Sequence, residues 1–148
     1  MLTVRGVDDL RAALEAMAAR IQTATPLAVE AGAEVLKAAA KAKLELKSHS
    51  RGTPTPSLKG EPPAKIDGRL RDSVTHSTPV LEGPGRWLTI VGATTVYAAI
   101  HELGGYAGRG HASYLPPRPY LRPAAEETIA NPAFREAFAK FWAEVIRT

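Results

Sequence analysis

Apolar residues recur at helical spacing near the start of the chain. Leu10, Leu14, Met17 and Ile21 follow one another at intervals of four, three and four positions. This spacing places them on one face of a helix. Asp8 precedes the stripe and is the expected N-cap, because its carboxylate can accept a hydrogen bond from a free N–H of the first turn. The pattern predicts helix over residues 8–47.

Thr25-Pro26 interrupts this helical segment. Proline is well tolerated at the first position after a threonine cap, so a second helix can begin here. The alternative is one long helix kinked at Pro26, because proline removes a backbone donor. Both interpretations remain open. Residues 27–46 carry a weaker apolar stripe among many alanines, whose small side chains let another backbone approach closely. This part of the helix is expected to pack on a sheet or on a neighbouring subunit.

A β-hairpin is expected in the middle of the chain. The segment "GRLRDSVTHSTPVLEG" (68–83) begins with alternating polar and apolar residues, and "RWLTIVGA" (86–93) is rich in β-branched and aromatic residues. The turn signal "EGPG" (82–85) lies between them. The two segments therefore predict antiparallel strands joined by a short turn.

The segment "VYAAIHELGG" (96–105) predicts a short helix stopped by two glycines. Tyr97, Ile100 and Leu103 are three positions apart and are expected to point inward together. His101 and Glu102 would then lie toward the rim, with Glu102 paired to Arg118 or Arg122. Gly104 or Gly105 can adopt the left-handed conformation that ends a helix.

A glycine-rich flexible loop is expected over 105–115, followed by "LPPRPYLRP" (115–123), in which four of nine residues are proline. Residues before proline favour extended backbone. The part "RPYLRP" (118–123) is therefore expected to be extended and can form an edge strand beside the hairpin, where missing N–H groups are tolerated. Its stiffness would reduce the entropy lost when a partner docks on it.

The last segment, residues 124–148, predicts a helix or a pair of helices divided by a cap at Asn131-Pro132. Its aromatic stripe comprises Phe134, Phe138, Phe141, Trp142 and Val145. Such a stripe indicates core or a subunit contact rather than a cofactor site. The expected fold is a single α+β domain over 1–148: a long N-terminal helix, a small antiparallel sheet with a hairpin, a short helix, and a C-terminal helix packed on the sheet.

Composition supports one globular domain. The chain has 148 residues, of which 45% are hydrophobic and 23% charged. It has no cysteine, which excludes disulfides, a thiolate nucleophile and cysteine-based zinc sites. The N-terminal sequence lacks the pattern of a secretory signal, and no apolar run approaches the ~18 residues of a membrane span.

The net charge is +4 and is unevenly distributed. Residues 41–71 contain eight lysines and arginines against three acidic residues, a local charge of +5. Within them, 48–67 is expected to be a long mobile, basic, proline-rich loop. The basic side chains of interest are Lys47, Arg51, Lys59, Lys65, Arg69 and Arg71. They indicate a solvated loop, or a surface for nucleic acid or an acidic protein. The segment has no aromatic residue for base stacking.

Candidate catalytic chemistry is sparse. His101, Glu102 and His111 carry groups that bind zinc or manganese, but their spacing does not give the paired arrangement of a zinc-binding helix. Acid–base catalysis by Glu102 with His76 or His101 would need a pocket that brings them together. No G-x-S-x-G motif is present. We therefore expect no enzymatic activity, no metal and no cofactor.

The order of the motifs resembles a known family. "G-x-L-R-D-S" (68–73), "VYAAIHELGG" (96–105), "PPRPYLRPA" (116–124) and a C-terminal helix follow one another. This order is similar to that of tail-completion and neck proteins of long-tailed bacteriophages, including the head–tail connector and virion-morphogenesis types. The resemblance covers most of the chain. It implies a small α+β structural protein of the virion, without catalytic role or cofactor, that joins the DNA-filled head to the tail.

The resemblance also implies partners and site residues. The subunit would form a homo-oligomeric ring, expected to be a hexamer, at the head–tail junction of the virion after assembly in the host cytoplasm. It would contact head-completion and tail-tube proteins, and DNA in the channel non-specifically, but no membrane. The matching residues are Tyr97, His101, Glu102, Gly104, Gly105, Pro117, Arg118, Pro119, Tyr120, Leu121 and Pro123. The 48–67 loop is longer and richer in proline than the family's usual link.

Two alternatives from other classes remain. A small basic DNA-binding protein would use residues 41–71 on phosphates, and its affinity would fall steeply with salt. A metal-dependent hydrolase, the less favoured alternative, would need His101, Glu102 and His111 to converge on an ion.

Overall fold

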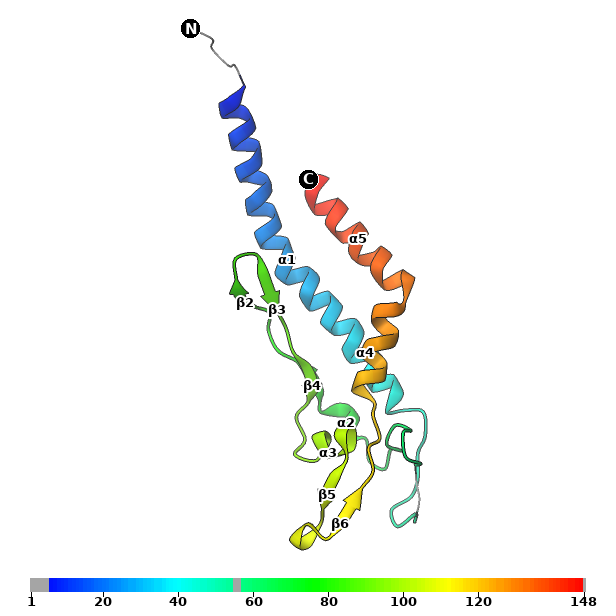
Figure 1. Ribbon diagram of the computed structural model, residues 1–148. Helices are drawn as coiled ribbons and strands as arrows, with labels where there is room; N and C mark the ends of the chain where they lie inside the picture. Colours follow the sequence, from blue (N-terminus) through cyan, green and yellow to red (C-terminus); the bar gives the residue numbers. More distant parts are fainter. Residues whose placement is uncertain (1–5, 55–56, 148) are drawn as a thin grey trace.

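The protein is an elongated α+β molecule (Figure 1). The computed structural model describes residues 6–54 and 57–147, apart from the side chains of Ala137, Val145 and Ile146. The helices are α1 (Val7–Lys43), α2 (Arg69–Asp72), α3 (Ala98–Leu103), α4 (Leu121–Ala130) and α5 (Pro132–Arg147), with a 3-10 turn η1 (Arg109–His111). The strands are β1 (Val74–His76), β2 (Val80–Gly83), β3 (Arg86–Leu88), β4 (Val91–Ala93), β5 (Gly105–Ala107) and β6 (Ser113–Leu115).

Helix α1 is one continuous helix of 37 residues with Pro26 inside it, about 55 Å long. A second helix starting at Pro26 is therefore wrong, and the single-helix alternative is confirmed. The expected Asp8 cap is also wrong: the helix begins at Val7, after Gly6 with φ 95°. Asp8 and Asp9 lie instead in the first turn, where their negative charge complements the positive end of the helix dipole.

The two parts of α1 have different surroundings. Residues 7–20, which we call the arm, are exposed throughout, and their end extends beyond α5 (Figure 1). Farther along, Ala24, Ala28, Ala33 and Ala40 are buried. Here α4 and α5 pack on α1, and β1, β3 and β4 also contact it. The small alanine side chains allow these close approaches, as the sequence predicts.

The expected hairpin forms in two sections. Near its base β1 pairs antiparallel with β4, and near its tip β2 pairs with β3. Residues 69–72, expected to begin the first strand, instead form α2. The reason is local: Gly68 has a left-handed φ of 81°, and the Asp67 carboxylate accepts a hydrogen bond from the Arg69 N–H at 3.1 Å. These two features start a helical turn in place of a strand.

Two further expectations for the second half are wrong. The segment 105–115 is not an irregular loop, because β5 and β6 pair antiparallel around η1. The segment 118–123 is not an edge strand: Arg118 and Pro119 pair with no described strand, and Leu121 begins α4. Pro123 lies in the first turn of α4, where its missing N–H leaves no helical hydrogen bond unmade.

The C-terminal segment is a pair of helices that break at Asn131. The Asn131 Oδ1 accepts a hydrogen bond from the Ala133 N–H at 3.0 Å, which confirms the expected cap. Helix α4 meets the sheet in the core, since Ala124 packs with Val74 of β1. Helix α5 packs on α1, and this differs from the expected packing on the sheet.

The aromatic stripe of α5 faces the small residues of α1. Phe134, Phe138 and Phe141 line a groove of about 130 Å³ with Ala28 and Gly32 of α1. Trp142 lies edge-to-face with Phe138, the ring centroids 6.4 Å apart. The stripe therefore packs α5 against α1. Part of this contact is exposed, since Phe138 is 37% accessible. The Val145 side chain lies outside the described residues.

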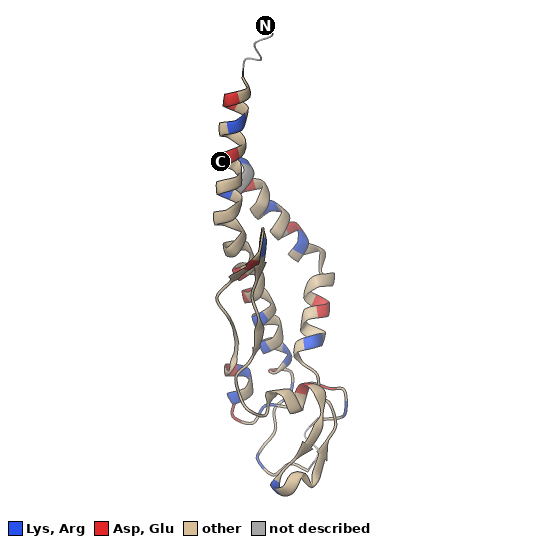
Figure 2. Cartoon of the chain, turned by 60° about the vertical axis from the view of Figure 1, so that its left-hand side comes forward, with Lys and Arg blue, Asp and Glu red and all other residues tan. Residues whose placement is uncertain are grey.

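The main core lies where α1 ends. It contains Ala40, Leu44, Val74, Tyr120 and Ala124, drawn from α1, β1 and the start of α4. Charged residues of both signs are distributed along the helices (Figure 2). In the described ranges, no helix combines the length and apolar character needed to cross a membrane.

Candidate assembly site

Glu102 of α3 caps the N-terminus of α4. Its Oε2 accepts hydrogen bonds from the Tyr120 and Leu121 N–H groups at 2.9 and 3.0 Å, and its Oε1 accepts one from the Arg122 N–H at 2.8 Å. Helix α4 has no side-chain cap at Tyr120, its own N-cap position. A distant carboxylate thus satisfies three donors that the helix cannot satisfy itself and complements the helix dipole.

The expected ion pair between Glu102 and the side chain of Arg118 or Arg122 is therefore wrong. Glu102 contacts the main chain of Arg122, whereas the Arg122 side chain binds Glu126 at 2.9 Å. Through the three hydrogen bonds Glu102 links α3 to α4 within the chain. They leave its carboxylate occupied, so acid–base catalysis by Glu102 has no support in this geometry.

Gly104 closes the turn against the proline segment. It has a φ of 75°, and a Cβ added there would lie 2.9 Å from the Pro117 Cδ and backbone N. Real Cβ atoms do not approach backbone this closely, so only glycine fits without a shift. Gly104, one of the two glycines expected to end the helix, follows α3 as its C-cap, but with φ 75° and ψ 175° it does not adopt the expected left-handed helical conformation. The close approach of Pro117 adds a second reason for glycine here.

The proline segment is tied to the body by its main chain. The Arg118 N–H donates to the His101 carbonyl at 2.7 Å, and the Pro117 carbonyl accepts from the Gly60 N–H at 3.0 Å. Tyr120 follows and is only 2% exposed. Its burial raises the pKa of its hydroxyl to about 12, with Glu102 adding to the effect. Residues 117–120 thus join the 48–67 loop, α3 and the core.

His101 lies behind this segment, half-buried. Burial, and then the nearby Arg118 charge, lower the pKa of His101 below its ordinary value, so the neutral ring is favoured. Its ring contacts Tyr97 edge-to-face with centroids 5.8 Å apart. Of the residues expected to anchor α3, Ile100 is half-buried, but Leu103 is 76% exposed. The inward face of α3 is instead centred on the buried Ala98.

The metal alternative finds no supporting geometry. His111 is exposed in η1, and its Nδ1 lies 3.4 Å from the Tyr106 carbonyl oxygen. His101 is half-buried elsewhere, and Glu102 is engaged by α4. Within residues 6–54 and 57–147, no three histidine, aspartate or glutamate side chains are grouped as metal ligands. The set that a metal-dependent hydrolase requires is not assembled there.

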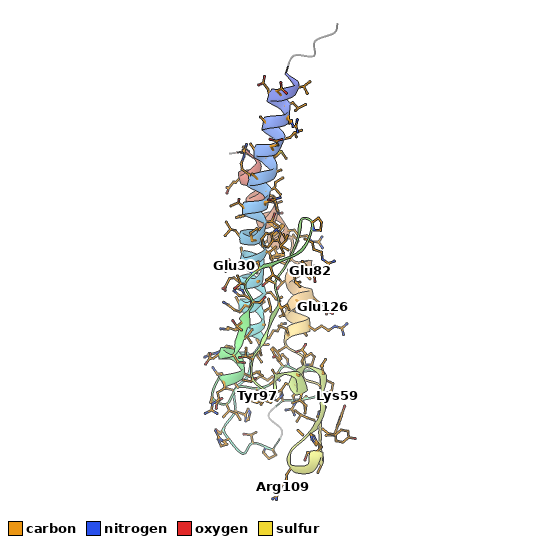
Figure 3. All side chains as sticks on the ribbon, turned by 90° about the vertical axis from the view of Figure 1, so that its left-hand side faces the viewer. Glu30, Lys59, Glu82, Tyr97, Arg109 and Glu126 are labelled. Atoms are coloured by element: carbon orange, nitrogen blue, oxygen red, sulfur yellow. The ribbon has the colours of Figure 1, made fainter. Side chains whose placement is uncertain are left out.

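The matched motif residues form a junction within the chain. Tyr120 is in the core, and His101, Glu102, Gly104, Gly105, Pro117, Arg118, Pro119, Leu121 and Pro123 are half-buried. Tyr97 is the exposed member, and Figure 3 labels it where the hairpin base meets the lower loops. Together, these motif residues fix the directions in which the β5–β6 hairpin and α4 extend from the core.

Most charges of the basic stretch are paired with acids of the same chain. Lys47 binds Glu61 at 2.7 Å, and Lys65 and Arg71 both bind Glu45. Arg69 contacts Asp67 at 3.3 Å. Arg51 and Lys59 have no ion pair in the part of the chain that is described. Few positive charges are thus left for phosphates, which weakens the DNA-binding alternative.

The 48–67 loop is more closely attached to the body than the sequence suggests. Its two ends come together as Lys65 donates its N–H to the Lys47 carbonyl at 2.8 Å and accepts from the His49 N–H at 2.9 Å. Gly60 reaches the proline segment, as described above. Residues 55–56 of this loop lie outside the described residues. These hydrogen bonds attach the described parts of the loop to the body, and its mobility stays a prediction.

Exposed apolar side chains occur on several elements, among them the arm and the tip of the hairpin. On the arm, Val7, Leu10 and Leu14 are more than half exposed. At the tip of the hairpin, Val80 and Leu81 of β2 are also more than half exposed. The arm stripe was visible as a periodic pattern, but periodicity alone does not tell which helix face stays uncovered.

Comparisons with family models, with curated proteins and with solved structures found no match for this chain.

Proposed function

We propose that this chain is a structural subunit of the bacteriophage head–tail junction, a tail-completion or neck protein that joins the DNA-filled head to the tail. The proposal starts from the order of motifs in the sequence. It includes assembly into a homo-oligomeric ring, expected to be a hexamer, that contacts head-completion and tail-tube proteins. The subunit acts by shape and contact and carries out no reaction.

The observation that carries the proposal is the surface left uncovered by one elongated subunit. The accessible surface is 10509 Å² for a mass of 15.8 kDa. A compact monomer of this mass exposes about 7,300 Å². The excess is larger than the roughly 800 Å² that one partner contributes to a standard interface. Such a shape is suited to a subunit that is completed by neighbouring chains.

The location of apolar surface supports the same conclusion. The arm exposes Leu10 and Leu14 at 60% and 57% on one face, in continuous helix. Contiguous exposed apolar surface in a folded protein marks an interaction site. The motif junction at Glu102 and Gly104 supplies the other requirement of a ring subunit, which is a fixed angle between its protruding parts.

The test is to image particles produced by a phage that lacks this protein. We expect filled heads and polymerised tails that fail to join, or tails without a proper end. Complementation with the intact gene should restore complete particles. Normal infectious particles in its absence would reject the assignment.

A further inference from the structure

A cleft of about 400 Å³ lies between the 48–67 loop, α2, α3 and the proline segment. Tyr97, labelled in Figure 3, is one of its lining residues. Basic and histidine side chains from all four segments line it, among them His49, Arg51, His101 and Arg118. Asp67 is the acidic residue among the lining residues.

Three residues that line this cleft each carry a buried polar atom without a hydrogen-bond partner. In the described part of the chain, four buried side-chain nitrogen or oxygen atoms lack a hydrogen-bond partner. Three of them, Ser57 Oγ, His101 Nδ1 and Arg118 Nε, belong to residues that line the cleft. Ser57 is only 3% exposed. A ligand oxygen that reaches these atoms would satisfy groups that proteins rarely leave without a partner.

The charge of the cleft identifies the sign of that ligand. Asp67 is already engaged by Arg69 at 3.3 Å. Arg51 and Arg118 have no carboxylate partner within residues 6–54 and 57–147. A partly buried guanidinium is stabilised by an anion that accepts its N–H groups. Burial and Arg118 also lower the pKa of His101, which keeps that ring neutral and able to hydrogen-bond.

The remaining walls indicate a peptide rather than a nucleic acid. Leu44, Pro63, Leu70 and Tyr97 supply apolar surface. This lining suits the methylene groups next to a carboxylate. Duplex phosphates, by contrast, are reached by exposed lysine and arginine side chains, whereas the Ser57 hydroxyl lies beneath the surface.

We propose that this cleft binds a carboxylate of an acidic peptide segment, an Asp or Glu side chain or a chain terminus, presented by another polypeptide. The guanidinium of Arg118 and the hydroxyl of Ser57 donate to the carboxylate, and His101 contributes a third contact. The cleft belongs to the single subunit, so this inference does not depend on a role at the head–tail junction.

The experiment is a titration of the ¹⁵N-labelled full chain followed by two-dimensional NMR. The probe is the blocked peptide Ac-Ala-Glu-Leu-Glu-NH₂, and its control is the same peptide with both Glu replaced by Gln. Inorganic phosphate and a short DNA duplex are titrated separately. We expect the acidic peptide to shift the amide signals of Ser57, Gly68, His101 and Arg118 in a saturable manner, while the Gln peptide has no effect.

Variants test which groups bind. Arg118→Gln is expected to weaken peptide binding at least about tenfold, because a charge-assisted hydrogen bond is lost. Ser57→Ala removes one hydroxyl, is less disruptive to folding, and is expected to weaken binding by ~3- to 10-fold. The matched control, Arg86→Gln, removes the same charge from an exposed side chain at the hairpin tip, and should leave the affinity unchanged.

Several outcomes would overturn the inference. Equal binding of the Gln peptide would mean that no carboxylate is recognised. Stronger shifts of the same signals by phosphate or DNA would assign the cleft to phosphate instead. Equal loss of affinity in Arg86→Gln would indicate general charge attraction. Should Arg118→Gln fail to fold, unchanged affinity in Ser57→Ala would by itself reject the proposal. None of these results bears on the particle phenotype that tests the proposed function.

Discussion

At the scale of single residues, Glu102 connects parts of the chain that are far apart in sequence. One carboxylate accepts three main-chain hydrogen bonds at the start of α4. Glu102 stands out in the sequence, but the expected arginine side chain is not its partner: main-chain N–H groups are. A cap within the same helix can be recognised from sequence, whereas this cap comes from 18 residues before Tyr120. The available signal was negative: no capping residue stands at the start of α4.

Replacing Glu102 by Gln should destabilise the protein. Gln keeps the size of the side chain but replaces one acceptor oxygen with an NH₂ group facing N–H donors. We expect a loss of about 1–3 kcal/mol in the free energy of unfolding, measured by urea denaturation. Glu126→Gln is the control, because Glu126 makes an exposed pair with Arg122, and its effect should stay below about 0.5 kcal/mol. Equal effects in the two variants would contradict the capping role.

Gly104 and Gly85 allow two reasons for glycine, a positive φ and a lack of space for a Cβ, to be tested separately. Both have positive φ, 75° and 68°, but an added Cβ would clash with Pro117 only at Gly104 and meets nothing within 4 Å at Gly85. Gly85→Ala should therefore cost about 1 kcal/mol from backbone strain alone. Gly104→Ala should lower the thermal midpoint clearly further, because the clash is added. A similar midpoint for both would show that Pro117 moves aside freely.

His76 is expected to make stability depend on pH. Its Nε2 lies 2.8 Å from Glu34 Oε1. This hydrogen bond, and then one to the Ser77 carbonyl, raise the pKa of His76 above its ordinary value of 6.5, although Lys37 opposes the shift. The protonated ring is thus favoured in the folded state. The stabilisation is complete below pH 6.5 and is lost as the pH rises through the raised pKa.

Glu34→Gln tests this dependence. The pKa of His76, followed by NMR of its ring protons, should move down toward its ordinary value. The decline of the urea midpoint on raising the pH through the His76 titration should become smaller. Glu15→Gln, which breaks the exposed Arg11 pair of the arm, serves as the control. An unchanged His76 titration in Glu34→Gln would remove Glu34 as the cause of the shift.

At the scale of elements, the sequence predicted periodic segments better than short ones. The stripe of the long helix, the hairpin and the Asn131 cap each depend on local patterns, and all three are present in the structure. The strands β5 and β6 have three residues each and are held by pairing with one another, so no periodic signal marks them. The strand expected over 118–123 does not form: main-chain contacts with Gly60 and His101 hold Pro117 and Arg118, and Leu121 begins α4.

The choice between one helix and two at Pro26 was not decided by local sequence. Proline leaves the Gln22 carbonyl without its helical donor, which favours a break. Ala24 and Ala28, which lie two positions before and after Pro26, are both buried. Tertiary packing across the proline therefore holds the helix continuous at a local expense in stability.

Pro26→Ala should accordingly stabilise the protein. Alanine restores the backbone N–H and the helix propensity, and we expect a gain of about 1–3 kcal/mol in the free energy of unfolding. The gain is partly offset because alanine leaves the unfolded chain more freedom. Pro84→Ala, in the exposed turn between β2 and β3, should give no such gain. A less stable Pro26→Ala protein would mean that packing depends on the shape of the proline ring.

At the scale of the whole molecule, the arm should act in association and not in folding. Leu10→Glu with Leu14→Glu changes two side chains that are already exposed, so the thermal midpoint of the isolated subunit should change little. Association measured by sedimentation velocity, alone or with extracts of phage-infected cells, should decrease. The matched control, Ala12→Glu with Ala16→Glu, places the same charges on the opposite helix face. Equal loss of association in both would contradict a contact through the leucine face.

The arm also has a mechanical consequence. Residues 7–20 extend for about 20 Å beyond the part of α1 that the other elements hold. An α-helix of this length is stiff, so the arm moves as a rigid rod when the alanine-rich section tilts. A tilt of only 10° in the alanine-rich section moves the N-terminal end of the arm by about 4 Å, close to the rise of three residues. Small adjustments near the hairpin base are thereby magnified at the opposite extremity of the molecule.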